Sequence, residues 1–215
     1  MIPQLGQRLV FAAAIGATVL GLASSALARD GVRPGQPAPD FTAQDTQGRT
    51  VTLSGLKGKT VVLEWTNHEC PYVKKHYGTG TMQKLQTDAK TDDVVWLTVI
   101  SSASGQQGHV EALEADKLTE DRKAVPAAVV LDPDGKVGRL YGATATPHMF
   151  VIDKAGTLAY MGAIDDKPST ARETIGTARP YVREALAALR DGKPVSAPAS
   201  TRAYGCSIKY SDARS

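Results

Sequence analysis

The sequence is poor in aromatic residues, has only two cysteines, Cys70 and Cys206, and carries a formal net charge of only +3. Its charges are interspersed, with no basic block, so the composition argues against a nucleic-acid partner. It has no internal repeat, no low-complexity segment and no flavin or nicotinamide motif, so we expect no cofactor. What remains is a globular composition, 42% apolar and 22% charged, in a chain long enough for one domain with a real core.

Charge is also scarce at the N-terminus, where Arg8 is the only charged residue before Arg29. An apolar, Ala/Gly-rich run lies between them, and Ala26-x-Ala28 fits the small-residue rule for signal peptidase. We therefore expect residues 1–28 to be a signal peptide, with an uncleaved anchor as the alternative. No other run is long enough to span a membrane. The mature protein is predicted to be exported to the periplasm or secreted, without stable membrane insertion.

The remaining chain predicts one domain over residues 29–194 and a tail over residues 195–215 that carries Cys206 and packs on the domain. Apolar runs without alternation indicate strands buried on both faces, at residues 60–65, 92–101 and 127–131. Short hairpins are expected before and after these strands, at residues 41–53 and 148–164. Helical patterns occupy residues 71–89, with an interruption at 78–80, and residues 108–124 and 170–190. The order predicts an α/β fold with a mixed central sheet, helices on both faces and an N-terminal β-hairpin.

Cys70 lies where a buried strand gives way to a helix. The polar turn at residues 66–69 delivers it, and Pro71 suits the first helical position. Free backbone N–H groups and the helix dipole favour a thiolate there, and Lys74 and Lys75 add positive charge. Because α/β folds place ligands at this edge of the sheet, we interpret Cys70 as a reactive thiol. A buried, inert cysteine is the alternative.

Several stretches of this sequence carry a family resemblance. They are Gly35-x-Pro37-x-Pro39-Asp40-Phe41, the strand that runs into Cys70-Pro71, and Thr146-Pro147 before Phe150-Val151-Ile152-Asp153. Together they resemble the thioredoxin-like fold, and more narrowly the redoxin branch that holds peroxiredoxins and the alkyl hydroperoxide reductase/thiol-specific antioxidant proteins, over residues 33–189. The resemblance implies an exported thiol-based oxidoreductase with antioxidant activity, in which Cys70 attacks and Pro147 faces the active sulfur.

The sequence departs from the family pattern around Cys70. Val73 stands where thioredoxins carry the second cysteine of Cys-x-x-Cys. Typical peroxiredoxins have a proline seven residues before and a threonine three residues before the attacking cysteine, and here those positions hold Leu63 and Asn67. Pro147 matches the position of an arginine in typical peroxiredoxins. Asn67 and Thr66 are therefore the candidates to replace the usual peroxide-activating groups.

Cys206 is the natural resolving partner if Cys70 turns over, because a sulfenic acid condenses with a second thiol to a disulfide. It could reach Cys70 in the same chain or from another subunit. Electrons would then come from an external dithiol protein, and the substrate would be a hydroperoxide or a protein disulfide. A thiol–disulfide exchange protein is one alternative. Another is a non-catalytic binding module with a permanent Cys70–Cys206 bond, which would stabilise the fold by about 5 kcal/mol.

Three histidines lie near these residues in sequence or in the expected fold. His68 and His76 flank Cys70, and His148 follows Pro147. A cysteine with two histidines could bind copper or zinc. Because such sites usually contain two neighbouring cysteines, we expect no metal here.

Overall fold

The computed structural model describes Met1, residues 31–196 and residues 198–211. The expected signal peptide therefore lies outside the described residues, apart from Met1, and its cleavage stays a prediction. Within the described part of the chain, no helix is both long enough and apolar enough to cross a membrane.

A seven-stranded mixed sheet forms the centre of the domain, with the strand order β2-β1-β5-β4-β3-β7-β8. The three central strands run parallel to one another, and the remaining pairs are antiparallel. The strands are β1 (Thr42–Asp45), β2 (Thr50–Thr52), β3 (Val61–Trp65), β4 (Val95–Ile100), β5 (Ala128–Leu131), β7 (His148–Ile152) and β8 (Leu158–Gly162). This is the mixed sheet with an N-terminal hairpin that the sequence predicts.

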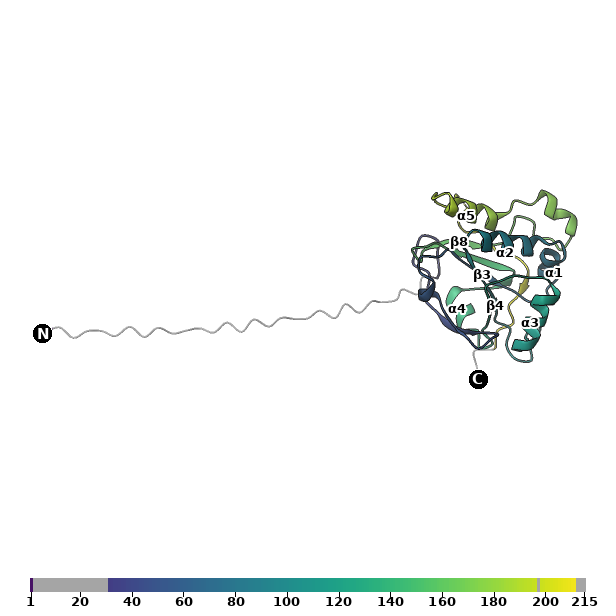
Figure 1. Cartoon of the computed structure of the whole chain (residues 1–215), viewed down its shortest axis with the longest axis horizontal. Helices are drawn as coiled ribbons and strands as arrows, with labels where there is room; N and C mark the ends of the chain where they lie inside the picture. The colour runs from purple at the N-terminus through teal and green to yellow at the C-terminus, as the bar shows by residue number, and fades with distance from the viewer. Residues whose placement is uncertain (2–30, 197, 212–215) are drawn as a thin grey trace. The chain divides into compact units, whose positions relative to one another are not determined.

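Helices cover both faces of the sheet, with α2 and α5 on one side and α4 on the other (Figure 1). The helices are α1 (Pro71–Gly78), α2 (Thr81–Thr91), α3 (Ala112–Asp121), α4 (Lys136–Tyr141) and α5 (Tyr181–Arg190). One apolar core joins α1, α2 and α5 to the sheet, and a second joins α4 to the opposite face. All five side chains of β3 are buried between these two layers, which explains why its four apolar residues do not alternate with exposed polar ones.

Two predicted helices are shorter than their patterns suggest. The helix predicted at residues 170–190 is two elements, a 3-10 helix η2 (Arg172–Thr177) and α5, which begins only after Pro180. The prediction was wrong there because a proline disfavours the helical conformation of the residue before it. The helix predicted at residues 108–124 is confined to α3. Gly108 lies outside it with φ +84°, a left-handed conformation that an α-helix does not contain.

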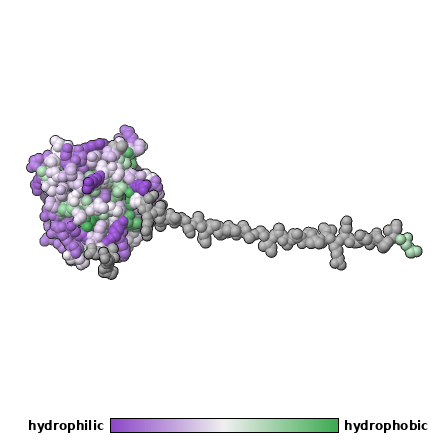
Figure 2. All heavy atoms as spheres, turned by 180° about the vertical axis from the view of Figure 1, so that it is seen from behind, coloured by the Kyte–Doolittle hydropathy of each residue, from purple (hydrophilic) through white to green (hydrophobic). Residues whose placement is uncertain are grey.

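The interruption predicted at residues 78–80 is confirmed. α1 ends at Gly78, and Gly80 adopts φ +75° at the start of α2. On the face shown in Figure 2, the described surface is mostly hydrophilic with small apolar patches. The large apolar side chains exposed in residues 31–196 and 198–211 are Leu113, Val125 and Leu140.

The C-terminal tail packs on the domain, as predicted. Its strand β9 (Cys206–Ser207) pairs antiparallel with β6 (Ala145–Thr146), forming a separate two-stranded sheet. Ile208 of the tail is buried in the core beside α4. The segment from Tyr204 to Ile208, called the strap below, therefore lies against the domain beside β6.

Candidate active site

Cys70 occupies the N-cap position of α1, directly after the turn that follows β3. Its extended conformation (φ −66°, ψ 122°) and Pro71 at the first helical position start the helix cleanly. The side chain is fully buried, and its Sγ donates to the carbonyl oxygen of Thr146 at 3.1 Å. The thiol is therefore held between the start of a helix and the loop that precedes β7.

The loop opposite Cys70 contains a cis peptide bond between Thr146 and Pro147. Thr146 pairs with Cys206 in the β6–β9 ladder, and its Oγ1 donates to the Cys206 carbonyl oxygen at 3.3 Å. Gly205 packs so closely here that a Cβ atom on it would lie 2.0 Å from the Thr146 carbonyl oxygen. The tail backbone thus lies directly against the residue that contacts the Cys70 sulfur.

This arrangement brings Cys206 to Cys70 within one molecule, and both cysteines are free thiols. Burial raises the pKa of Cys70, but hydrogen bonds from Cys206 and Thr146 outweigh it, so the net pKa lies below that of an ordinary thiol. The Val73 N–H, at the third position of α1, adds to the lowering without forming a capping hydrogen bond of good geometry. Burial and contact with Cys70 raise the pKa of Cys206 to about 11. The pair therefore loses its first proton mainly from Cys70.

A second tail residue, Tyr204, fixes the strap on the domain. Its hydroxyl donates a very short hydrogen bond to Asp165 and lies 3.3 Å from Nε2 of His76. Its ring lies 5.6 Å from the ring of Tyr72, centroid to centroid. The Nζ of Lys75 lies 5.6 Å from the centroid of the Tyr204 ring and donates to the Lys167 carbonyl oxygen. Lys75 is thus committed to the tail and to residue 167, not to the thiol as the sequence suggested.

Thr66 and Asn67 are the two residues expected to replace the usual peroxide-activating groups. Both side chains are buried in the segment that precedes Cys70. Asn67 is committed to backbone: its Oδ1 accepts from Glu69 N at 2.9 Å, and its Nδ2 donates to the Gln107 carbonyl oxygen at 3.4 Å. Thr66 Oγ1, in contrast, is buried without a hydrogen-bond partner in the described part of the chain. Of the two side chains, only the Thr66 hydroxyl is therefore uncommitted in the described structure.

The three histidines lie in different surroundings. His76 is buried against Tyr204, His148 lies against the ring of Phe150, and His68 is half-buried in the turn before Cys70. Burial lowers the pKa of His76 and of His148 to about 4. No group of three metal-ligating side chains is found among residues 31–196 and 198–211.

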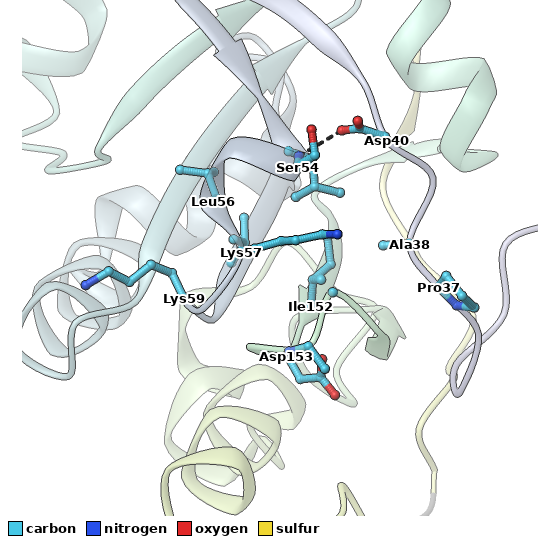
Figure 3. A pocket seen from close by; sticks show the side chains of 13 residues that line it. Pro37, Ala38, Asp40, Ser54, Leu56, Lys57, Lys59, Ile152 and Asp153 are labelled. Carbon is cyan, nitrogen blue, oxygen red and sulfur yellow. Dashed lines mark hydrogen bonds between the residues drawn. The ribbon is translucent and has the colours of Figure 1, made fainter.

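The pocket drawn in Figure 3 is lined by neither of the two cysteines. Its volume is about 260 Å³, and Val61 and Ile152 form part of its wall. These residues pair at one end of β3 and β7, whereas Trp65 and His148 pair at the end that leads to Cys70. Lys57 extends along the pocket (Figure 3). The Cys70 sulfur, in contrast, is fully buried, with Cys206 of the tail packed in the same cluster.

Sequence reasoning missed three features of this end of the molecule. Thr146 and Tyr204 were not singled out, although each adjoins a residue that was, Thr146 before Pro147 and Tyr204 two residues before Cys206. Glu64 was taken as part of an apolar strand. It is fully buried and accepts hydrogen bonds from four side chains, and burial raises its pKa. Those donors are Tyr77, Gln86, Trp96 and Thr98. A single acidic residue inside an apolar run was the available signal for it.

A mixed sheet between two helical layers, a cysteine at the start of α1 and a cis-proline opposite it define a thioredoxin-like fold, and solved structures agree. A hypothetical protein from Sinorhizobium meliloti 1021 superposes with a TM-score of 0.72 at 22% identity, covering 85% of this chain and 97% of that one. A proposed thiol:disulfide interchange protein DsbE from Chlorobium tepidum gives a TM-score of 0.50 at 25% identity, covering 61% and 85%.

The family follows from the sequence comparison. The AhpC/TSA family model matches residues 34–161, and the chain belongs to this family. Among curated proteins, the thiol-disulfide oxidoreductase ResA of Bacillus subtilis (strain 168) is 26% identical over an alignment of 155 residues, and the match covers 67% of this chain and 86% of that protein. The redoxin resemblance inferred from the motifs is confirmed.

Proposed function

We propose that this protein is a thiol–disulfide oxidoreductase in which Cys70 is the attacking thiolate and Cys206 of the same chain is the resolving thiol. One observation carries the proposal. The β6–β9 pairing places Cys206 against Cys70, and the two thiols have pKa values shifted in opposite directions. The likeness to ResA, whose name describes the same chemistry, supports it.

The reaction begins when the Cys70 thiolate attacks one sulfur of a protein disulfide. A new S–S bond forms, the old one breaks, and the released sulfur keeps the electron pair and takes a proton from solvent. This step removes the negative charge on Cys70, which is one cause of the high pKa of Cys206. Cys206 then loses its proton more readily, attacks the Cys70 sulfur and releases the second sulfur of the substrate. The substrate gains two electrons, and the chain keeps a Cys70–Cys206 disulfide.

An external dithiol protein would return the chain to its reduced form. Cys70 is fully buried and Cys206 is half-buried, so the incoming thiolate has better access to the Cys206 sulfur. Attack there makes Cys70 the leaving group, and the thiol with the lower pKa leaves faster. The same asymmetry thus favours Cys70 as nucleophile in one direction and as leaving group in the other. Pro147 would form the wall opposite the reacting sulfur.

A hydroperoxide is the second candidate substrate, favoured by membership of the AhpC/TSA family and by the uncommitted hydroxyl of Thr66. Cys70 would attack the peroxide oxygen, the O–O bond would break, and the alcohol or water would leave with a proton. The resulting sulfenic acid would condense with the Cys206 thiol, releasing water and forming the same disulfide. Thr66, with Asn67 shaping the turn, would donate to the peroxide.

We also propose that the protein works outside the cytoplasm. The proposal rests on the signal-peptide pattern of residues 1–28 in the sequence, which precedes the family match. An exported thiol couple would depend on a reducing partner in that compartment, since disulfides persist there.

Equilibrating the protein in graded dithiothreitol and glutathione buffers tests the proposal. A working couple should form an intrachain Cys70–Cys206 bond with a potential between about −180 and −270 mV, the range of known exchange proteins. A potential below about −300 mV would mark a structural bond and overturn the proposal. Adding one equivalent of hydrogen peroxide to the reduced protein separates the two substrate classes. Sulfenate or disulfide formation within seconds supports the peroxidase reaction, and an unreactive Cys70 excludes it.

A further inference from the structure

The β6–β9 pair has an unusual place in this fold. β6 takes no part in the seven-stranded sheet, and its only ladder is with the chain's own tail in the described structure. Two backbone bonds flank the pair: Ile208 N donates to the Thr144 carbonyl oxygen at 3.3 Å, and Ala103 N donates to the Lys209 carbonyl oxygen at 2.8 Å. Removing the tail would leave a short strand edge beside the Cys70 sulfur. Such an edge binds an extended segment by strand addition.

We propose that β9 occupies, in the reduced protein, the groove that receives an extended cysteine-containing segment of a partner protein. The inference rests on the proposed function and specifies its substrate class. The partner's cysteine would take the place of Cys206 opposite Thr146, which puts its sulfur against Cys70. The tail is then a built-in copy of the substrate, and it must leave the groove for the partner to enter.

The contacts of the tail define what the groove accepts. The residue before the cysteine must be glycine, because Gly205 has φ +132° and a Cβ there would lie 2.0 Å from the Thr146 carbonyl oxygen. The side chain two residues after the cysteine must be apolar, because Ile208 is buried in the core beside α4. An aromatic residue two positions before the cysteine fits where Tyr204 meets Tyr72. The predicted class is an aromatic-Gly-Cys-x-apolar segment.

Exchange with this segment follows the chemistry already given. The Cys70 thiolate attacks the partner's disulfide sulfur, the partner's other sulfur leaves with the electron pair, and a mixed disulfide holds the segment in the groove. When the tail returns, Cys206 attacks the Cys70 sulfur and expels the segment as a thiol. Because the tail is tethered, its effective concentration is high, and only the fraction of molecules with an open groove binds the partner.

The test uses the full-length chain with Cys206→Ser, which leaves Cys70 as its single thiol. The probe is the heptapeptide Ala-Tyr-Gly-Cys-Ser-Ile-Lys, whose cysteine carries a thionitrobenzoate group. A second peptide has alanine in place of the glycine. Attack by Cys70 releases coloured thionitrobenzoate, so stopped-flow absorbance gives the rate. Small-molecule 5,5′-dithiobis(2-nitrobenzoate) serves as the reagent that makes no use of the groove.

Two glycine substitutions, each added to Cys206→Ser, form a matched pair. Gly205→Ala should expel the tail by collision with Thr146, whereas Gly192→Ala, also at positive φ, meets nothing within 4 Å. We expect Gly205→Ala to accelerate reaction with the glycine peptide about tenfold, since a tenfold change in open fraction needs only about 1.4 kcal/mol. Gly192→Ala should leave the rate at that of the parent. In every variant the glycine peptide should react about tenfold faster than the alanine peptide.

Equal rates for the two peptides would overturn the inference, as would equal rates for the two glycine variants. If Gly205→Ala does not fold, the ratio of the two peptide rates on the Cys206→Ser parent decides the matter. The small reagent separates this inference from the proposed function. If Cys70 reacts with the reagent but does not discriminate between the peptides, the result contradicts only the proposed binding groove. A Cys70 that reacts with neither the reagent nor the peptides contradicts the proposed function itself.

Discussion

Cys70 lies at the junction of a buried strand and a helix, whereas Cys206 lies on a two-residue strand of the C-terminal tail. The first thiol is fully buried, and its pKa lies below the ordinary value. The second is half-buried, with a pKa of about 11. The core holds Cys70 in place, whereas the two-residue β6–β9 pairing and a few side chains, Tyr204 foremost, hold Cys206. The difference suggests a division of labour in which a fixed nucleophile meets a detachable second sulfur.

Replacing each cysteine in turn separates the two roles most strongly. Cys70→Ser should lower the rate of exchange with a disulfide substrate roughly a thousandfold or more, the scale on which loss of a catalytic nucleophile acts. Cys206→Ser should leave the first step nearly intact and accumulate a mixed disulfide at Cys70. Single-turnover kinetics with mass analysis distinguish these outcomes. Similar losses in both first-step rates would contradict the division of roles.

The attachment of the tail can be weakened without touching either sulfur. Tyr204→Phe removes the hydroxyl that donates to Asp165, and a hydrogen bond to a charged group contributes about 1.5–3 kcal/mol. The equilibrium constant for opening of the tail in the reduced protein, measured by hydrogen exchange of its backbone amides, should therefore rise by roughly 10- to 100-fold. Tyr181→Phe, in α5, is the matched control and should leave it unchanged. An unchanged constant in the Tyr204 variant would show that the tail is held by other contacts.

Acid should destabilise the folded protein through two buried histidines, one near Pro147 and one against Tyr204 of the tail. Burial lowers the pKa of His148, beside Pro147, and of His76, beneath Tyr204, to about 4, from 6.5. Between pH 6.5 and 4 the unfolded chain binds protons that the folded chain does not, so the free energy of unfolding falls as the pH falls. From pH 7 to pH 5 each histidine should remove about 2 kcal/mol.

His148→Gln tests the size of this effect. Between pH 7 and pH 5, the free energy of unfolding of the variant should fall by about 2 kcal/mol less than that of the parent, as measured by urea unfolding at each pH. His109→Gln, at a partly exposed site, is the control and should follow the parent. If His148→Gln also follows the parent, the imidazole at position 148 is not buried in its neutral form.

The smallest expected effect concerns the hydrogen bond between the two sulfurs. Cys206→Ala removes a group that favours the Cys70 thiolate, so the pKa of Cys70 should rise. Thiolate absorbance at 240 nm, followed against pH, should show its midpoint moving upward. Cys206→Ser retains a hydroxyl donor and should move it less. A midpoint that stays in place would assign the lowered pKa to the helix and Thr146 alone.

The sequence was sufficient to predict the core of this fold. The runs around Val61, Trp96 and Val129 lack alternation because both faces of the sheet are covered, and this pattern is legible in one dimension. The position of Cys70 was equally legible, because Pro71 follows it at the start of a helix.

The contacts of the tail could not be predicted in the same way. A two-residue strand such as β9 has no periodicity, and its pairing depends on tertiary contacts far away in sequence. Whether Cys206 meets Cys70 of its own chain was therefore open. Gly205 is the clearest sign of the contact in the sequence, because only glycine allows the backbone to approach Thr146 so closely. The commitment of Asn67 to the turn was hidden for the same reason.

Resolution of Cys70 by Cys206 of the same molecule can be measured directly. Reduced protein is treated with substoichiometric 5,5′-dithiobis(2-nitrobenzoate) to place thionitrobenzoate on Cys70, and the release of a second thionitrobenzoate is followed over about a hundredfold range of protein concentration. Intramolecular resolution predicts a first-order rate that is independent of protein concentration and an intrachain Cys70–Cys206 bond by mass. A rate proportional to protein concentration, with disulfide-linked dimers, would contradict it.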